Sequence, residues 1–373
     1  MKKVLVFETS LRGHILEYIH HLYVKSVCDK TCYYYFVLPD DFESLKSKFD
    51  WPVAENVEII MINSSVVSAC EEKTQFLRAY SKLNLLLKYV KQLRADLVIL
   101  VMMMDFAPFL AFANWGNTKV CGIIYKVFLN ERLSTIRLLI NKFIYTCFSK
   151  RKCFDRLFIL NDVVSAERLN SMFNTSKFMY LPDPVPRIDM KKVRSIRKEL
   201  NISDLDKMFL HFGGLTERKG TLDILRAAEM VDPSFLSQIV LVFAGKVNEG
   251  IREAFYELVG KLDNRIRVIV YDKFCSYDLL YDLCYSCDVI LVPYHFVNLS
   301  SGVIGYAAFF GKPVVGPSQG LLGNLISVNS LGVTFDEVSP EKLKEIFTMD
   351  FSPTDSDYCL THSVDDFVNT IIQ

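Results

Sequence analysis

The stretch "LHFGGLTERKGTLDIL", residues 210–225, runs from an apolar strand-like segment through two glycines into a helical pattern. Arg218 and Lys219 stand side by side just before that helix. The helix macrodipole already places about half a positive charge there, so two cations cost roughly a few tenths of a kcal/mol unless an anion lies between them. Phosphate groups commonly bind at helix N-termini. We therefore predict a phosphate site, with an ordinary solvated surface turn as the alternative.

Strand-like and helical patterns alternate on both sides of this stretch. The strand-like runs occupy residues 3–8, 32–38, 56–62, 96–103, 119–125, 156–160, 207–214, 239–245, 265–271, 288–294 and 312–316. Such alternation predicts βαβ units and parallel sheets. The segment "LPDPVPRID" (181–189) interrupts it with three prolines, which exclude a helix and break a sheet ladder. We predict an α/β protein of two Rossmann-like domains, 1–183 and 184–373, facing each other across a cleft.

Composition excludes several classes of protein. The 373 residues contain 43 Lys and Arg and 43 Asp and Glu, so no overall field attracts nucleic acid. The ten cysteines form no disulfide module and "MKKVLVFETS" enters a strand at once, so we expect no signal peptide and a cytoplasmic location. Cys284 and Cys287 have zinc-like spacing without a second pair, so we favour packing. The apolar run 97–104 ends at Asp105, far short of the roughly 20 residues that a spanning helix needs.

Two further turns carry candidate site residues. Gly13 and His14 follow the first predicted strand, where glycine lets the backbone approach a ligand and a histidine can act as acid or base. A plain capped turn explains the same letters equally well. Ser300, Ser301 and Gly302 precede another predicted helix, where hydroxyls and amides either cap the helix or bind a phosphate.

The downstream motifs together resemble a known family. The segments 213–227, 241–247, 281–294 and 305–316 follow one another as in the C-terminal domain of GT-B glycosyltransferases, and residues 205–335 most resemble the large retaining group numbered family 4. The resemblance implies that the C-terminal domain binds a nucleotide-sugar donor. It also implies that the N-terminal domain binds the acceptor and that no metal or other cofactor is needed.

The resemblance assigns residues to the donor. Lys219 matches the family lysine that neutralises the diphosphate, whereas Gly214 occupies the position of the family arginine, so Arg218 has to substitute from beside it. The positions that correspond to donor-binding segments are Gly213, Gly214, Lys273, Phe274, Asn298, Ser300, Ser301 and Gly302.

One departure from the family concerns its paired glutamates. Their positions hold Asn298 and Tyr306, and residues 289–335 contain no acid at all. The ribose and sugar hydroxyls that carboxylates usually bind therefore need other partners, for which the Asn298 and Ser300–Ser301 side chains are candidates.

The chemistry does not require those acids, because breaking a sugar–phosphate bond mainly requires stabilising the departing nucleoside diphosphate. Arg218, Lys219 and the helix amides supply that electrostatic stabilisation. A retaining reaction can use the leaving phosphate as proton acceptor. An inverting reaction needs a separate base, for which Glu8, His14 and Asp105 are candidates at predicted strand ends.

Three alternatives remain at this stage. A metal-dependent GT-A transferase uses a D-x-D pair to hold the metal. Such pairs occur at 204–206 and 355–357, but both lie in polar stretches where we favour caps or loops over a metal site. A GT-B protein that has lost catalysis and serves as a partner subunit is favoured by the missing glutamates and opposed by the phosphate turn. A nucleotide-sugar 2-epimerase needs acids and histidines around the sugar, which the segment 289–335 lacks.

Residues 132–154 combine cations with apolar residues at helical spacing and contain no acid. The simpler interpretation is a helix that packs its apolar face on the sheet and exposes its cations. The alternative is a peripheral contact with an anionic membrane surface, where each basic residue contributes on the order of 1 kcal/mol. That location suits a lipid-linked saccharide acceptor at the inner face of a membrane.

Overall fold

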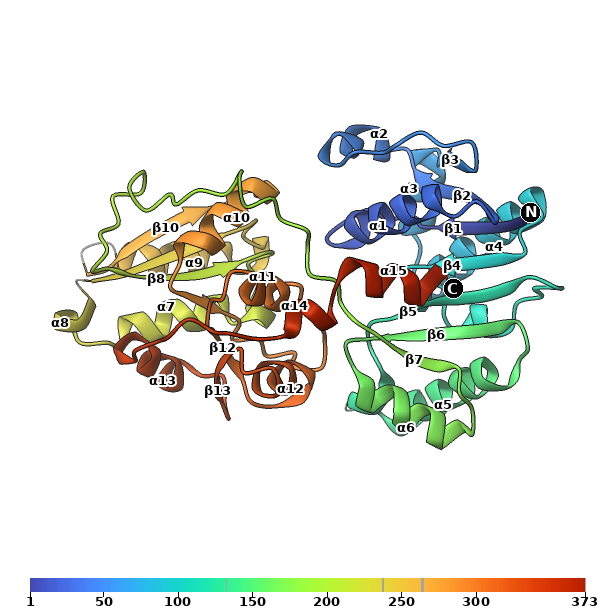
Figure 1. The fold of residues 1–373 in the computed structure, drawn as a ribbon. Coiled ribbons are helices and arrows are strands. Elements are labelled where there is room, and N and C mark those ends of the chain that lie inside the picture. The colour runs from blue at the N-terminus through green and yellow to red at the C-terminus, as the bar shows by residue number, and fades with distance from the viewer. Residues whose placement is uncertain (132, 237, 263–264, 373) are drawn as a thin grey trace. The chain divides into compact units, whose positions relative to one another are not determined.

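The computed structural model describes residues 1–131, 133–236, 238–262 and 265–372 (Figure 1). The chain divides into two compact units, Met1–Pro182 together with the C-terminal helix, and Asp183–Val364. The division falls inside the proline-rich segment. The C-terminal helix, which we expected within a second domain of 184–373, instead groups with the first unit from Asp365 onward.

The first unit is built on a parallel sheet with the strand order β3-β2-β1-β4-β5-β6-β7 in the part of the chain that is described. Its strands are β1 (Lys2–Phe7), β2 (Cys32–Pro39), β3 (Val57–Ile62), β4 (Leu97–Leu100), β5 (Lys119–Ile124), β6 (Phe154–Leu160) and β7 (Phe178–Leu181). Its helices are α1 (Ile15–Cys28), α2 (Phe42–Leu45), α3 (Ser64–Glu71), α4 (Gln75–Leu93), α5 (Thr135–Lys150), α6 (Val163–Phe173) and α15 (Val364–Ile372). Short 3-10 turns are η1 (Lys46–Lys48), η2 (Met103–Phe106), η3 (Phe109–Ala111) and η4 (Phe128–Asn130).

The second unit repeats this topology, with the order β10-β9-β8-β11-β12-β13 among its described residues. Its strands are β8 (Lys207–Phe212), β9 (Ile239–Ala244), β10 (Arg267–Tyr271), β11 (Val289–Leu291), β12 (Val314–Pro317) and β13 (Gly332–Phe335). Its helices are α7 (Thr221–Glu229), α8 (Pro233–Leu236), α9 (Arg252–Leu262), α10 (Tyr277–Ser286), α11 (Val303–Phe309), α12 (Gly320–Val328), α13 (Pro340–Leu343) and α14 (Tyr358–Thr361). Its 3-10 turns are η5 (Glu217–Lys219), η6 (Glu249–Ile251) and η7 (Lys344–Thr348).

Each sheet is buried on both faces, which explains why its central strands read as continuous apolar runs. Every residue of β4 and of β9 is buried. Cys284 and Cys287 are fully buried in the core of the second unit, and the Cys287 thiol donates a hydrogen bond to the carbonyl of Cys284. The predicted strands correspond to observed ones, whereas β7 and β13 were not predicted because these edge strands are only partly buried and lack a continuous apolar run.

Helix α15 completes the first unit at the C-terminal end of the chain (Figure 1). The fully buried Phe367 ring lies 4.8 Å from the Tyr18 ring of α1, measured between centroids. Arg156 of β6 donates a hydrogen bond of 3.2 Å to the carbonyl of Thr370. These contacts explain why the last residues belong to the first unit.

Helix α5 corrects the simpler interpretation of residues 132–154. Ile144 and Phe148 are buried on the core as expected. The prediction is wrong for the apolar side chains of the first turns, which are 45% to 72% exposed: Ile136, Leu139, Ile140 and Phe143. Arg132 lies outside the described residues. Across the described chain, no helix is long and apolar enough to cross a membrane.

Candidate functional site

Each sheet has one point where its chain order reverses, and both candidate sites lie there. In the second unit β8 lies between β9 and β11, and in the first unit β1 lies between β2 and β4. In open parallel sheets, ligands bind beyond the carboxyl ends of the strands at such a point. The turn after β8 and the segment after β11 form the predicted donor region of the second unit, and the segments after β1 to β4 enclose a pocket in the first.

The turn after β8 depends on glycines that let two backbones approach closely. Gly213 has a φ of 96°, and Gly245, at the end of β9, has a φ of 152°. A Cβ atom at Gly245 would lie 1.7 Å from the carbonyl oxygen of Gly213. Gly214 is exposed and nothing lies within 4 Å of its Cβ position. The turn therefore presents an open backbone at the edge of the sheet.

Arg218 and Lys219 lie on η5, directly before α7, as the sequence predicts. Gly220 links η5 to the helix with a φ of 69°, and a Cβ there would lie 2.1 Å from the carbonyl oxygen of Pro293. The Lys219 ammonium lies 5.1 Å from the centre of the Tyr294 ring. The same ammonium would be 2.7 Å from a Cβ at Gly213. The cation is thus held over the glycine turn.

A buried histidine links β11 to the first residue of α7, next to this turn. His211, which is 1% exposed, lies with Nδ1 2.9 Å from the carbonyl of Leu291 and Nε2 3.1 Å from the Thr221 hydroxyl. Burial, together with the nearby charge of Lys219, lowers the pKa of His211 to about 4. The neutral ring donates to the carbonyl and accepts from the hydroxyl, so it fixes the first residue of α7 without adding charge.

The segment after β11 holds the other predicted donor residues. Ser300 and Ser301 precede α11, whose N-cap is Gly302. The Ser300 hydroxyl donates a hydrogen bond of 2.6 Å to Asp183, a buried carboxylate from the proline-rich segment. Asn298 lies against Gly320, at the start of α12. Asp183 supplies an acid to a region whose own sequence has none, and the sequence analysis missed it.

Lys273 and Phe274 lie in the exposed loop between β10 and α10, and Phe274 is 68% exposed. Two hydroxyls nearer the turn have no hydrogen-bond partner among the described residues although they are buried. These are the Tyr294 hydroxyl, on a side chain that is 5% exposed overall, and the Thr216 hydroxyl at the N-cap of η5. Buried polar atoms are usually paired, so these two indicate a place for a ligand or for ordered water.

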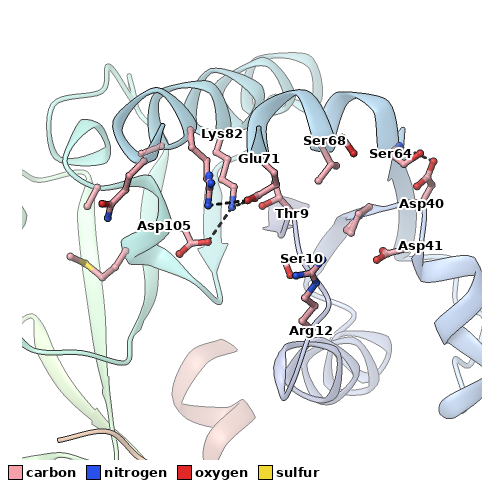
Figure 2. Close-up of a pocket in the computed structure, with 17 residues that line it drawn as sticks. Thr9, Ser10, Arg12, Asp40, Asp41, Ser64, Ser68, Glu71, Lys82 and Asp105 are labelled. Atoms are coloured by element: carbon pink, nitrogen blue, oxygen red, sulfur yellow. Dashed lines mark hydrogen bonds and ion pairs between the residues drawn. The ribbon is translucent and has the colours of Figure 1, made fainter. Parts of the chain in front are cut away.

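The first unit contains a polar pocket of about 600 Å³ (Figure 2). It is lined by Thr9, Ser10, Arg12, Pro39, Asp40, Asp41, Ser64, Val67, Ser68, Glu71, Gln75, Arg78, Ala79, Lys82, Met104, Asp105 and Ala107. These side chains come from the ends of β1 to β4 and from α3 and α4. The sequence predicted Asp105 but not the lining residues of α3 and α4, because these reach the strand ends only through the fold.

Lys82 organises one side of this pocket (Figure 2). Its ammonium lies 2.6 Å from Glu71 and 3.2 Å from Asp105, and its side chain is only 4% exposed. Burial disfavours the charge, but the hydrogen bond to Glu71 and the charge of Asp105 outweigh it and raise the pKa of Lys82. Arg78 pairs with Glu71 at 3.2 Å. The network fixes two carboxylates at the pocket wall.

Glu8 lies behind the same wall at the end of β1 and is 1% exposed. Its Oε1 accepts hydrogen bonds from the backbone N–H groups of Thr9 (2.8 Å) and Ser10 (3.3 Å), while Oε2 has no partner among the described residues. Burial raises the pKa of Glu8 to about 7, with a smaller contribution from the charge of Asp105. Glu8 is therefore near the midpoint of its titration at neutral pH.

His14 is the N-cap residue of α1, in the first unit. Its side chain is 53% exposed, its Nδ1 lies 3.9 Å from Glu17, and its ring stacks on Tyr18. The other predicted site residues, from Gly213 to Gly302, lie in the second unit. His14 is thus placed at an exposed helix start, and its role stays a prediction.

Comparison with known proteins bears on the fold. No family model matches the chain. Over a stretch of 150 residues, the chain is 25% identical to the uncharacterised glycosyltransferase MJ1607 of Methanocaldococcus jannaschii. The matched stretch covers 40% of this chain and 37% of that protein. The chain thus matches only about a third of that relative's length.

Solved structures match over the whole chain. The glycosyltransferase WaaG, involved in lipopolysaccharide biosynthesis, matches with a TM-score of 0.66 and 15% identity, covering 100% of this chain and 95% of WaaG. Anabaena HepE in complex with UDP-glucose matches with a TM-score of 0.69 and 13% identity, covering 100% and 98%. The chain has a GT-B-like fold. The S. aureus MnaA–UDP structure shares it, with a TM-score of 0.65, 15% identity and coverage of 100% and 95%.

The titration of Glu8 makes the stability of the first unit depend on pH. A carboxyl whose pKa rises from 4.5 to about 7 on folding stabilises the fold fully below pH 4.5, and this contribution is lost as pH rises through 7. At about 1.4 kcal/mol per pH unit, the loss amounts to about 3 kcal/mol. Glu8→Gln should remove this dependence and raise the free energy of unfolding at pH 8.

Both tryptophans, Trp51 and Trp115, lie in the first unit, so their fluorescence in urea reports its unfolding at pH 5 to 8. Glu43→Gln is the matched control, because that carboxylate is 49% exposed. An unchanged pH dependence in Glu8→Gln would contradict the assignment.

Proposed function

We propose that the protein is a glycosyltransferase that moves a sugar from a nucleotide-sugar donor to a saccharide or lipid-linked saccharide acceptor. The observation that carries this proposal is the pair of cations, Arg218 and Lys219, on a glycine turn at the reversal point of the second sheet. The pair and the start of α7 suit a diphosphate, as do the buried hydroxyls of Thr216 and Tyr294, which have no hydrogen-bond partner among the described residues. HepE has been solved with UDP and with UDP-glucose, which supports a nucleotide-sugar donor here.

The proposed chemistry is stabilisation of the leaving nucleoside diphosphate by preorganised positive charge. Arg218 and Lys219 face the charge that develops as the sugar–phosphate bond breaks, and no metal is required. We propose a retaining reaction, in which the leaving phosphate accepts the acceptor's proton on the front face of the sugar. If the reaction inverts, Glu8, Asp105 or His14 has to act as base.

The acceptor is proposed to bind in the pocket of the first unit. Its lining contains carboxylates, cations and hydroxyls, and at one end Asp40 accepts a hydrogen bond of 2.8 Å from the backbone N–H of Ser64 (Figure 2). Sugar hydroxyls pair well with such groups, because each can donate to a carboxylate and accept from a cation. The alternative of a non-catalytic partner subunit explains neither this pocket nor the unpaired hydroxyls at the donor turn.

The cation pair gives the first test of the function. Changing Arg218 and Lys219 together to Ala should abolish binding of a nucleoside diphosphate, because both charges are lost at an exposed turn while the core is untouched. Calorimetry with UDP, GDP and ADP measures the effect, and circular dichroism checks the fold. Lys261→Ala, at a cation that is 49% exposed on α9, is the matched control. Unchanged affinity in the double variant would refute the donor site.

Metal independence is tested separately by chelation. Transfer or hydrolysis of a nucleotide sugar should proceed at an unchanged rate in EDTA, because the two cations take the place that a divalent ion has in metal-using transferases. Activity that disappears in EDTA and returns with Mn²⁺ would contradict this and favour a metal-dependent mechanism.

A peripheral membrane contact through residues 132–154 is part of the proposal. The exposed apolar side chains of α5 continue through η3 onto α4, because Phe112 stacks on Phe143 and Phe109 contacts both Phe76 and Tyr80. Arg137, Lys142, Lys150 and Lys152 are exposed around this face. Arg151 is not available, since its guanidinium donates to the carbonyls of Ala111 and Ala113. Apolar side chains ringed by cations suit an anionic lipid surface.

Vesicle sedimentation tests this contact. The protein should pellet with anionic vesicles at low salt, less at high salt, and little with neutral vesicles. Leu139→Glu should abolish pelleting, because it places a negative charge on the apolar face. The Leu139 side chain is 61% exposed. Leu360→Glu, at a leucine that is 75% exposed in the second unit, should behave like the unchanged protein. Failure to pellet with anionic vesicles at low salt would leave α5 as a core-packing helix alone.

A further inference from the structure

A histidine and an aspartate meet beside the cation pair in the second unit. His295 follows β11, and its backbone N–H donates a hydrogen bond of 2.9 Å to the carbonyl of Arg218. Its Nε2 lies 2.8 Å from Oδ2 of Asp223, in the first turn of α7. The ring therefore joins the two segments that border the donor turn.

The orientation of this ring follows from its partner. A carboxylate can only accept, so Nε2 carries a hydrogen and donates it to Asp223. The Asp223 side chain is 13% exposed and also lies 3.7 Å from Arg226, whereas the His295 side chain is 41% exposed. No described residue makes a hydrogen bond with Nδ1. An imidazole that is fixed through one nitrogen presents the other to a ligand, as an orienting carboxylate does in other sites.

The surroundings of His295 are those of an anion site. The Lys219 ammonium lies over the ring of the neighbouring Tyr294. The buried hydroxyl of Tyr294 has no hydrogen-bond partner among the described residues. Arg218 contacts His295 through the backbone, and its guanidinium belongs to the exposed part of the same turn. His295 thus lies in one cluster with the cation pair, bonded to the backbone of Arg218 and next to the tyrosine that contacts Lys219.

We propose that His295 binds the terminal phosphate of the nucleoside diphosphate, donating from Nδ1 as an imidazolium held by Asp223. This inference rests on the proposed function, since it assigns a further ligand to the same donor. It gives Asp223 the part of a positioning residue, which acts on the phosphate only through the ring.

Two replacements separate phosphate binding from a structural tie. The amide nitrogen of Gln reaches the place of Nε2, so His295→Gln keeps the contact with Asp223 and loses the Nδ1 donor. Calorimetry should show about a tenfold weaker affinity for UDP, the loss of one charge-assisted hydrogen bond, and an unchanged affinity for UMP, which lacks the terminal phosphate. Asp223→Asn should weaken UDP binding less than His295→Gln and should also spare UMP. Lys261→Gln, at a cation that is 49% exposed on α9, is the control and should bind both nucleotides normally.

The outcomes distinguish this inference from the proposed function. If His295→Gln binds UDP as tightly as the unchanged protein, the ring only ties the loop to α7 and the inference is wrong. Equal weakening of UDP and UMP would likewise assign His295 to the shape of the turn. If the unchanged protein binds none of UDP, GDP, ADP and CDP, the donor site itself fails, and the inference fails with it.

Discussion

Two adjacent positive charges at the positive end of a helix are the constraint on which the second unit depends. Arg218 and Lys219 repel each other and the dipole of α7, so an anion bound between them stabilises the turn. The backbone around the turn leaves no room for a side chain at Gly220, which packs on Pro293, or at Gly245, which packs on Gly213. The neutral His211 supports the helix start without adding to the positive charge. We propose that a bound diphosphate supplies the balancing negative charge.

The two units share one sheet topology but carry different side chains at the corresponding edge. In both parallel sheets the strand order reverses at the first strand of the unit, β1 or β8. The loops that follow neighbouring strands therefore meet at one edge of each sheet. In the second unit that edge carries a glycine turn and two cations, of which Arg218 is exposed and Lys219 half-buried. In the first unit it carries a pocket whose carboxylates are held by Lys82, with the buried Glu8 behind them. We propose that the surface of the second unit binds the charged leaving group and that the pocket of the first unit binds the saccharide acceptor.

Local patterns predicted the alternating strands and the turn at Arg218 and Lys219, since both depend on residues close in sequence. Asp183 reaches Ser300 across 117 positions, and Asp223 reaches His295 across 72, so neither contact has a signature in the local sequence. The exposed face of α5 could not be predicted either, because helical spacing shows that apolar residues share a face but not what covers it. Helix α15 shows the same limit, as its partner Tyr18 lies near the other end of the chain.

We propose that the turn after β8 and the segment after β11 together bind a nucleoside diphosphate. The most direct measurement is a crystal structure of the protein grown with UDP. The account predicts diphosphate density between the turn 213–220 and the segment 294–302, within hydrogen-bonding distance of the Lys219 ammonium. Density for the diphosphate in the pocket of the first unit, with the turn empty, would contradict it.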